Sequence, residues 1–148
     1  MKAILHADGG ARGNPGPAGI GVVLTDERGD VIGEIARGIG EATNNIAEYR
    51  ALIAGLELAR DKGVTEIEIR LDSVLVVSQL KGEWKIKSDR LRSLAVQARR
   101  LFDSFPSASI SHVPREQNAD ADKLANQGMD EAMLDYEADR ETPQSLFE

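Results

Sequence analysis

The sequence contains no cysteine, which excludes a disulfide scaffold, a thiol nucleophile and a zinc site built on thiolates. Only two histidines occur, His6 and His112, too few for a structural zinc site. Aromatic residues make up 4% of the 148 residues, so a core has to rest on Ile, Leu, Val and Ala. No apolar run approaches the length of a membrane span, and the first residues lack the basic flank of a signal peptide. We therefore expect a soluble, cytoplasmic protein without a membrane partner.

The formal charge is unevenly distributed along the chain. It sums to -7, from 18 Lys and Arg against 25 Asp and Glu. Residues 131–148 hold six acids and one base, whereas residues 81–100 hold seven bases and two acids. A nucleic-acid partner normally needs a basic surface, but most of the acidic excess lies in the tail. We expect one folded domain over residues 1–134 and an acidic, flexible tail over residues 135–148.

Hydrophobic periodicity and turn residues predict the element order βββ-α-β-α-α-β-α. The expected strands cover residues 2–8, 20–25, 31–37, 66–72 and 108–113, and the expected helices cover residues 46–62, 74–80, 91–102 and 118–134. Residues 9–17 are so rich in Gly and Pro that we expect a loop there. Three hairpin-connected strands followed by strands alternating with helices imply a mixed sheet, antiparallel first and then parallel. The predicted fold class is α/β, a mixed five-stranded sheet flanked by helices.

Four acidic residues stand where the pattern is otherwise apolar. Glu48 and Asp122 fall inside the apolar stripes of two predicted helices, and an unpaired buried carboxylate costs several kcal/mol. Asp8 and Asp72 end two predicted strands, and ligands commonly bind at the carboxyl ends of strands in α/β sheets. Each acid also has a plain structural interpretation, as a turn residue, a helix cap or a charge that favours the helix dipole. Together, the four favour a site for a hard divalent cation such as Mg²⁺ or Mn²⁺.

At these residues the sequence resembles the type 1 ribonuclease H family. The matching motifs, in the family's order over roughly residues 1 to 130, are Asp8-Gly9-Gly10 with Asn14-Pro15-Gly16 and Gly19, Thr43-Asn44-Asn45-Ile46-Ala47-Glu48, Leu71-Asp72-Ser73 and Ala121-Asp122-Lys123-Leu124-Ala125-Asn126. The resemblance implies a ribonuclease H-like fold and hydrolysis of the RNA strand of RNA–DNA hybrids, leaving 5′-phosphate and 3′-hydroxyl ends. It implies that Asp8, Glu48, Asp72 and Asp122 are catalytic carboxylates that hold two Mg²⁺ ions, with Mn²⁺ as a substitute, in a two-metal-ion mechanism.

Two further residues are candidates for a group that helps to activate water or to release product. Many family members have a His ten residues before the last Asp, and His112 stands there. A subgroup resembling the archaeal enzymes has an Arg seven residues before it, and Arg115 stands there. His112 could equally be a strand residue pointing at solvent or into packing. Arg115 could equally be an ordinary surface charge or a phosphate contact.

The resemblance also implies substrate contacts. RNA-containing duplexes display 2′-hydroxyl groups in a wide, shallow minor groove. The residues implied to contact them are Gly9, Gly10, Asn14, Asn44 and Asn45, while Thr43 is implied to hold a DNA phosphate. Trp84 and Lys85 lie in the basic stretch and suit contacts with the sugar–phosphate backbone. Without the family, Thr43-Asn44-Asn45 is simply a helix cap, and Trp84 a half-buried packing residue.

Many family members carry an additional basic helix and loop, called the handle, for which residues 82–88 leave no room. The sequence is therefore similar to the handle-lacking subgroup of archaeal and some bacterial members, which makes double-stranded RNA a second candidate substrate. We expect a monomer. Two other functions remain open: a nucleic-acid binding module without activity, and a small-molecule phosphatase. The complete set of four acids argues against the first, and Thr43-Asn44-Asn45 with the Trp84 stretch against the second.

Overall fold

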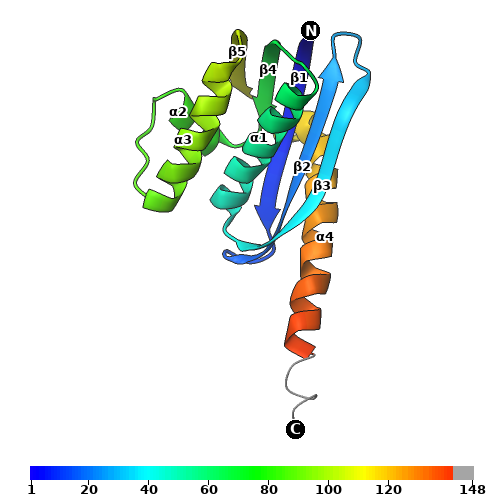
Figure 1. Cartoon of the computed structure of the whole chain (residues 1–148). Coiled ribbons are helices and arrows are strands. Elements are labelled where there is room, and N and C mark those ends of the chain that lie inside the picture. Colours follow the sequence, from blue (N-terminus) through cyan, green and yellow to red (C-terminus); the bar gives the residue numbers. More distant parts are fainter. Residues whose placement is uncertain (142–148) are drawn as a thin grey trace.

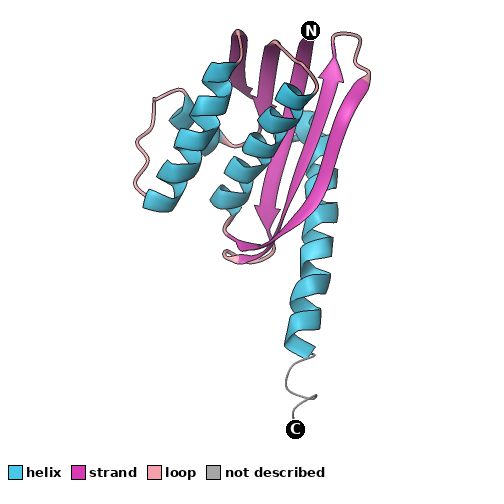
Figure 2. Cartoon of the chain, in the orientation of Figure 1, coloured by secondary structure: helices cyan, strands magenta, loops and turns pink. Residues whose placement is uncertain are grey.

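A five-stranded sheet forms the centre of the computed structural model, which describes the backbone of residues 1–141 and the side chains of residues 1–138 (Figures 1 and 2). Its strands are β1 (Lys2–Ala11), β2 (Gly16–Asp26), β3 (Val31–Ala42), β4 (Glu66–Leu71) and β5 (Ser107–His112), in the spatial order β3-β2-β1-β4-β5. The pairs β1–β2 and β2–β3 are antiparallel, and the pairs β1–β4 and β4–β5 are parallel. The predicted mixed sheet is thus confirmed.

Helices cover both faces of this sheet (Figure 1). They are α1 (Asn44–Asp61), α2 (Val74–Leu80), α3 (Asp89–Ser104), the 3₁₀ helix η1 (Arg115–Asn118) and α4 (Ala119–Glu141). α1 and α3 lie together on one face, and α4 lies on the opposite face. Hydroxyl groups cap the first three helices, because Thr43, Ser73 and Ser88 each accept a hydrogen bond from a backbone N–H of the first turn. No helix within the described residues is long and apolar enough to cross a membrane.

The core between the sheet and α1 is aliphatic, as the scarcity of aromatic residues predicts. Its fully buried side chains include Leu5, Leu24, Leu52, Leu56, Ile67 and Ile69. Tyr49 is the one aromatic residue of α1 in this core, and its hydroxyl donates a 2.6 Å hydrogen bond to Oε1 of Gln79 on α2. Burial raises the pKa of Tyr49 to about 12, with the charge of Glu48 as a smaller cause, so the hydroxyl stays a donor.

The first three strands are longer than the sequence predicts. β1 continues through Gly9 and Gly10 to Ala11, and β2 begins at Gly16, so the expected loop over residues 9–17 is wrong except for residues 12–15. The reason is cross-strand pairing, because Gly10 and Ala11 lie opposite Gly19 and Ala18 in the ladder. Glycine usually marks a loop, but here it marks strand positions that a helix approaches closely.

α4 lies backbone against backbone on the sheet. A Cβ atom on Gly21 would overlap the carbonyl oxygen of Ala121, and one on Gly19 would overlap the backbone nitrogen of Met129. In return, a Cβ on Gly128 would overlap the carbonyl of Arg37 on β3. Glycines on β2 and on α4 therefore allow the close contact that fixes the position of α4 on β2 and β3.

The last helix extends further than the sequence predicts. α4 ends at Glu141 and not at Leu134. Its final turns extend beyond the ends of the strands (Figure 1). The additional residues are mostly Glu, Ala, Asp and Arg, of which Glu, Ala and Arg favour helices. Part of the tail expected over residues 135–148 is therefore helical, and residues 142–148 lie outside the described residues.

Candidate active site

Strand register places two of the four predicted carboxylates side by side. Ala7 of β1 and Leu71 of β4 are partners in the parallel ladder. Asp8 and Asp72 follow these partners, so they lie side by side on the same face of the sheet, Asp8 within β1 and Asp72 just after the end of β4. Asp8 lies opposite Gly21 in the antiparallel ladder with β2, on the face that α4 covers.

Glu48 reaches this edge because Gly9 has no side chain. A Cβ atom on Gly9 would overlap the carbonyl group of Ala47 and lie 2.7 Å from the backbone nitrogen of Glu48. The first turn of α1 therefore lies directly on β1. Oε2 of Glu48 accepts a 2.9 Å hydrogen bond from the hydroxyl of Ser73, which itself caps α2 by accepting from the N–H of Val76 at 3.2 Å. Ser73 thus links Glu48 to the segment that carries Asp72.

Asp122 is placed by two contacts at the start of α4. Ala121 lies directly on Gly21, and Gly21 is the ladder partner of Asp8. The next residue, Asp122, is therefore held close to Asp8. Asn118 is only 1% exposed, and its Nδ2 donates a 3.0 Å hydrogen bond to the carbonyl of Ala7. It therefore ties η1 and α4 to the residue just before Asp8. Sequence reasoning assigned Asn118 no more than the start of a helix, since no local pattern shows that its partner is 111 residues away.

The four carboxylates influence one another electrostatically. Burial raises the pKa of Asp8 to about 8, with further contributions from the charge of Asp72, a hydrogen bond shared with Asp122 and the charges of Asp122 and Glu48. Burial also raises the pKa of Glu48 to about 7, with a smaller contribution from Asp72, while the hydrogen bond from Ser73 lowers it. The structure therefore brings together all four acids predicted from the sequence, in a place where their negative charges need compensation.

The donor set fits hard divalent cations. Four carboxylates without a thiolate or an imidazole among them match the oxygen ligands that Mg²⁺ and Mn²⁺ prefer. Within the described side chains, no three acidic or histidine groups already stand at the spacing that holds a metal ion.

The two candidate assisting residues occupy different positions. Nη2 of Arg115, on η1, lies 3.6 Å from Oδ1 of Asp122, so the structure brings Arg115 to the carboxylates. His112 is exposed at the end of β5, as the ladder partner of Leu71, and no contact joins it to the four acids in the described part of the chain. Both residues thus lie near the same edge of the sheet, but only Arg115 contacts a carboxylate of the cluster.

The predicted substrate-contacting residues fall into two groups. The first group lies where the turn between β1 and β2 approaches the start of α1, and it contains Asn14, Thr43 and Asn44. Oδ1 of Asn44 accepts a 2.9 Å hydrogen bond from the backbone N–H of Ala11. The backbone N–H of Asn44 donates a 3.1 Å hydrogen bond to Oδ1 of Asn14. Asn45 is exposed beside them. Gly10 packs near Met129, and Gly9 is buried beneath α1, so the close approach that Gly9 permits is that of the protein's own helix.

Trp84 and Lys85 form the second group, in the connection between α2 and α3. Trp84 is 48% exposed, and its backbone N–H donates to the carbonyl of Ser78 at 3.2 Å. The carbonyl of Lys85 accepts from the side chain of Gln79 at 3.5 Å. This connection covers residues 81–88 and contains no helix, in agreement with the predicted absence of a handle.

The raised pKa values predict how stability depends on pH in the absence of divalent metal. Below about pH 4 Asp8 and Glu48 are protonated in both the folded and unfolded states, and between about pH 4 and 8 only the folded state retains these protons. The free energy of unfolding contributed by these groups therefore falls as pH rises through this window, and it levels off above it. Asp8→Asn removes the charge. Because solvent partly screens Asp8, we expect this variant to be more stable than the parent protein by only roughly 1–2 kcal/mol near pH 8.5.

Urea unfolding in EDTA across the pH range measures this difference. The gap between Asp8→Asn and the parent should be smallest near pH 4 and largest at about pH 8 and above. Asp61→Asn, an exposed acid at the end of α1, is the matched control and should show no such growth. A gap that shrinks with rising pH would contradict the inferred electrostatics.

Known proteins resemble the chain over most of its length. Residues 6–128 match the family model described as reverse transcriptase-like. The chain is 50% identical over 140 residues to a bifunctional protein of Mycobacterium tuberculosis, which covers 94% of the chain but only 38% of that protein. It is 51% identical over 130 residues to ribonuclease HI of Halobacterium salinarum, covering 86% of the chain and 65% of the relative. It is 31% identical over 145 residues to ribonuclease H of Rhizobium meliloti, covering 88% of the chain and 92% of the relative.

Solved structures match as closely. The N-terminal ribonuclease H domain of the Mycobacterium tuberculosis protein has a TM-score of 0.89 at 47% identity, over 92% of this chain and 99% of that one. Ribonuclease H1 of Halobacterium salinarum has a TM-score of 0.86 at 48% identity, over 89% and 100%. LC11-RNase H1, isolated from compost and solved in complex with an RNA/DNA hybrid, has a TM-score of 0.83 at 45% identity, over 88% and 99%. With its four carboxylates at one edge of a matching sheet and no handle between α2 and α3, the chain belongs to the ribonuclease H family, among the members that lack the handle.

Proposed function

We propose that the protein is an endoribonuclease that hydrolyses the RNA strand of RNA–DNA hybrids. The observation that carries this proposal is the meeting of Asp8, Glu48, Asp72 and Asp122, which come from four separate segments of the chain. Burying repelling carboxylates destabilises a fold, so a cluster of this kind is typical of a functional site. A relative 45% identical in sequence that was solved with an RNA/DNA hybrid supports the choice of substrate.

The four carboxylates are proposed to hold two divalent cations, Mg²⁺ with Mn²⁺ as a substitute. When bound, such a pair supplies positive charge for the attacking water and for the leaving oxygen of the phosphodiester. The protein's part is to hold the carboxylates in place. Ser73 orients Glu48 by hydrogen bonding, and Asn118 anchors the start of the helix that carries Asp122 to β1. Both contacts fix a carboxylate before substrate arrives.

Arg115 is our first candidate for the assisting group, because its guanidinium already lies beside Asp122. At this position it can hold the carboxylate in place and offer charge-assisted hydrogen bonds to a phosphate. His112 stays a second candidate, on the same edge of the sheet. Removal of both groups is proposed to cost more activity than removal of either, since each can offer positive charge and hydrogen bonds to the same phosphate.

The polar groups around the start of α1 are proposed to bind the duplex. Asn14, Asn44 and Asn45 offer amide groups to the ribose hydroxyls of the RNA strand, and Thr43 is proposed to hold a phosphate of the DNA strand. Gly10 would permit close approach of the RNA. Trp84 and Lys85 would contact the sugar–phosphate backbone further along. This arrangement reads the shape of the duplex and its 2′-hydroxyl groups, so we expect little dependence on base sequence.

A cleavage assay with matched duplexes tests the proposal. An RNA–DNA hybrid, a double-stranded RNA and a double-stranded DNA of one sequence are incubated with the protein in Mg²⁺ or Mn²⁺, and again in EDTA. We expect cleavage of the RNA strand of the hybrid, with 5′-phosphate and 3′-hydroxyl ends, only when metal is present. Hybrid binding without turnover would instead indicate a binding module, and faster cleavage of double-stranded RNA would move the main substrate there. The monomeric state and cytoplasmic location expected from the sequence stay predictions.

A further inference from the structure

The side chain of Arg12, in the turn between β1 and β2, lies along one face of α4. Its Nη1 pairs with Oδ1 of Asp130 at 2.5 Å and donates to the sulfur of Met133 at 3.0 Å. Its Nη2 donates to the backbone carbonyl of Asn126 at 3.4 Å. These partners stand at positions i, i+4 and i+7, so they form one stripe of the helix. A single guanidinium group therefore attaches the turn to α4 at three points.

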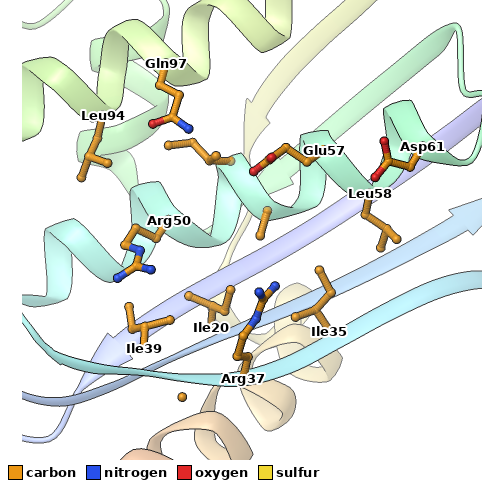
Figure 3. A pocket seen from close by; sticks show the side chains of 13 residues that line it. Ile20, Ile35, Arg37, Ile39, Arg50, Glu57, Leu58, Asp61, Leu94 and Gln97 are labelled. Atoms are coloured by element: carbon orange, nitrogen blue, oxygen red, sulfur yellow. The ribbon is translucent and has the colours of Figure 1, made fainter.

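Such attachment is not general among the exposed arginines of this protein. Arg37 and Arg50 face a groove between β3 and α1, on the other side of the sheet (Figure 3). Within the described residues, the side chain of neither makes an ion pair or a hydrogen bond. The side chain of Arg12, in contrast, is only 36% exposed. Its three contacts are thus a particular feature of the turn and not a general property of the surface.

The start of α1 holds the same turn from the other side. Oδ1 of Asn44 accepts from the backbone N–H of Ala11, and the backbone N–H of Asn44 donates to Oδ1 of Asn14. α1 also carries Glu48, and α4 carries Asp122. The turn is therefore held between the two helices that supply these carboxylates.

We propose that Arg12 is a positioning residue for substrate binding, which holds the turn that carries Asn14 in place relative to the carboxylates. This inference rests on the proposed function, because it assumes that Asn14 contacts the RNA strand. An exposed ion pair adds little to the stability of a fold. Restricting the motion of a binding group, however, lowers the entropic cost of binding. The contacts of Arg12 should therefore act on affinity, and hardly on kcat or on unfolding.

A guanidinium group in this turn could instead bind a phosphate of the duplex directly. The two roles predict opposite effects for Asp130. If Arg12 acts through its contacts with α4, Asp130→Asn loosens the turn and weakens binding. If Arg12 binds phosphate, Asp130→Asn releases the guanidinium group and strengthens binding.

Hybrid binding and cleavage by Arg12→Ala and Asp130→Asn test the proposal. We expect Kd in EDTA and KM in Mg²⁺ to rise about fivefold for Arg12→Ala and about threefold for Asp130→Asn, with kcat within about twofold of the parent. The double variant should bind no more weakly than Arg12→Ala, because both substitutions remove the same interaction. The slope of log Kd against log salt should change by less than about 0.5, whereas loss of a phosphate contact lowers it by about 0.9.

Arg99→Ala is the matched control. Arg99 of α3 also pairs with an acid, Asp103 at 3.1 Å, and donates to a backbone carbonyl, that of Leu80 at 2.9 Å, but it lies outside the turn. Its removal should leave Kd and KM within about twofold of the parent. Arg12→Glu/Asp130→Arg restores the pair in the reverse sense. It should bring KM to within about threefold of the parent, whereas Arg12→Glu alone should raise KM about tenfold.

A lower Kd for Asp130→Asn, or a salt slope reduced by a full phosphate contact in Arg12→Ala, would overturn the proposal and assign Arg12 to a phosphate. Parent-like Kd values in both variants would overturn it as well. The substituted side chains are exposed, and thermal unfolding within a few degrees of the parent verifies that the fold is kept.

Hydrogen exchange without nucleic acid separates this inference from the proposed function. The amides of Ala11 and Asn44 are hydrogen-bonded across the contact between the turn and α1, and they should exchange about fivefold faster in Arg12→Ala than in the parent. Exchange at the parent's rate would refute the inference alone. A parent that binds hybrids without cleaving them would refute the proposed function and leave the binding and exchange measurements intact.

Discussion

Replacement of Asp72 by Asn is expected to lower the rate of hybrid cleavage by about a thousandfold or more. The Asn side chain keeps the shape of Asp72 but removes a charge that acts on both Asp8 and Glu48. It would also remove an anionic oxygen from the proposed metal-binding set, which costs several kcal/mol of transition-state stabilisation. The measurement is the initial rate on a labelled hybrid at saturating Mg²⁺, with substrate in excess of KM.

The same substitution should not destabilise the fold. Removing one of four repelling carboxylates leaves Asp8 and Glu48 easier to ionise, so the midpoint of thermal unfolding in EDTA should stay level or rise. Asp103→Asn, which removes an exposed acid paired with Arg99, is the control and should retain the parent's rate. A rate for Asp72→Asn within tenfold of the parent would show that the chemistry does not depend on this cluster.

Gly21→Ala is expected to affect stability most among small substitutions in the sheet. The new methyl group would occupy the place of the Ala121 carbonyl oxygen, and a backbone atom cannot move aside as a flexible side chain can. Lifting α4 should reduce the free energy of unfolding by about 2–4 kcal/mol. Because Asp122 directly follows Ala121, the rate of cleavage should also fall, by about tenfold or more, even at temperatures where the variant is fully folded.

Gly33→Ala provides the matched comparison for urea unfolding and activity. It introduces the same methyl group on the neighbouring strand β3, where the nearest atoms belong to the flexible end of the Leu58 side chain. It should cost clearly less stability and leave the cleavage rate unchanged. If the two variants were equally stable and equally active, the backbone contact between α4 and β2 would not be what places Asp122.

The sequence predicted those parts of the structure that depend on neighbouring residues. The helix over residues 74–80 has the predicted bounds because Ser73 caps it locally. Glu48 and Asp122 could be recognised because a helix has a fixed period, so an acid inside an apolar stripe is visible without coordinates. Asp72 could be recognised because β4 ends where the alternation of polar and apolar residues ends. Asp8 was predicted at a strand end as well, but β1 continues past it to Ala11.

Features that depend on distant pairing could not be predicted. Gly9 and Gly10 looked like loop residues, and only the ladder with β2 and the approach of α1 show them to be strand residues. The buried role of Asn118 depends on a strand more than a hundred residues earlier. Likewise, nothing in the sequence shows that Arg92 and Arg99 are paired while Arg50 and Arg90 are not, because pairing of exposed charges depends on side-chain geometry.

The central position of β1 has a consequence for the energetic cost of assembling the site. β1 is hydrogen-bonded to β2 on one side and to β4 on the other, so its amides exchange with solvent only when one of these ladders opens. Asp8 is therefore attached to a part of the protein that opens rarely, and fluctuations of the edge strands cannot relax the repulsion around it. The conformational entropy of gathering the four acids is lost once, during folding, and does not have to be lost again in each catalytic cycle.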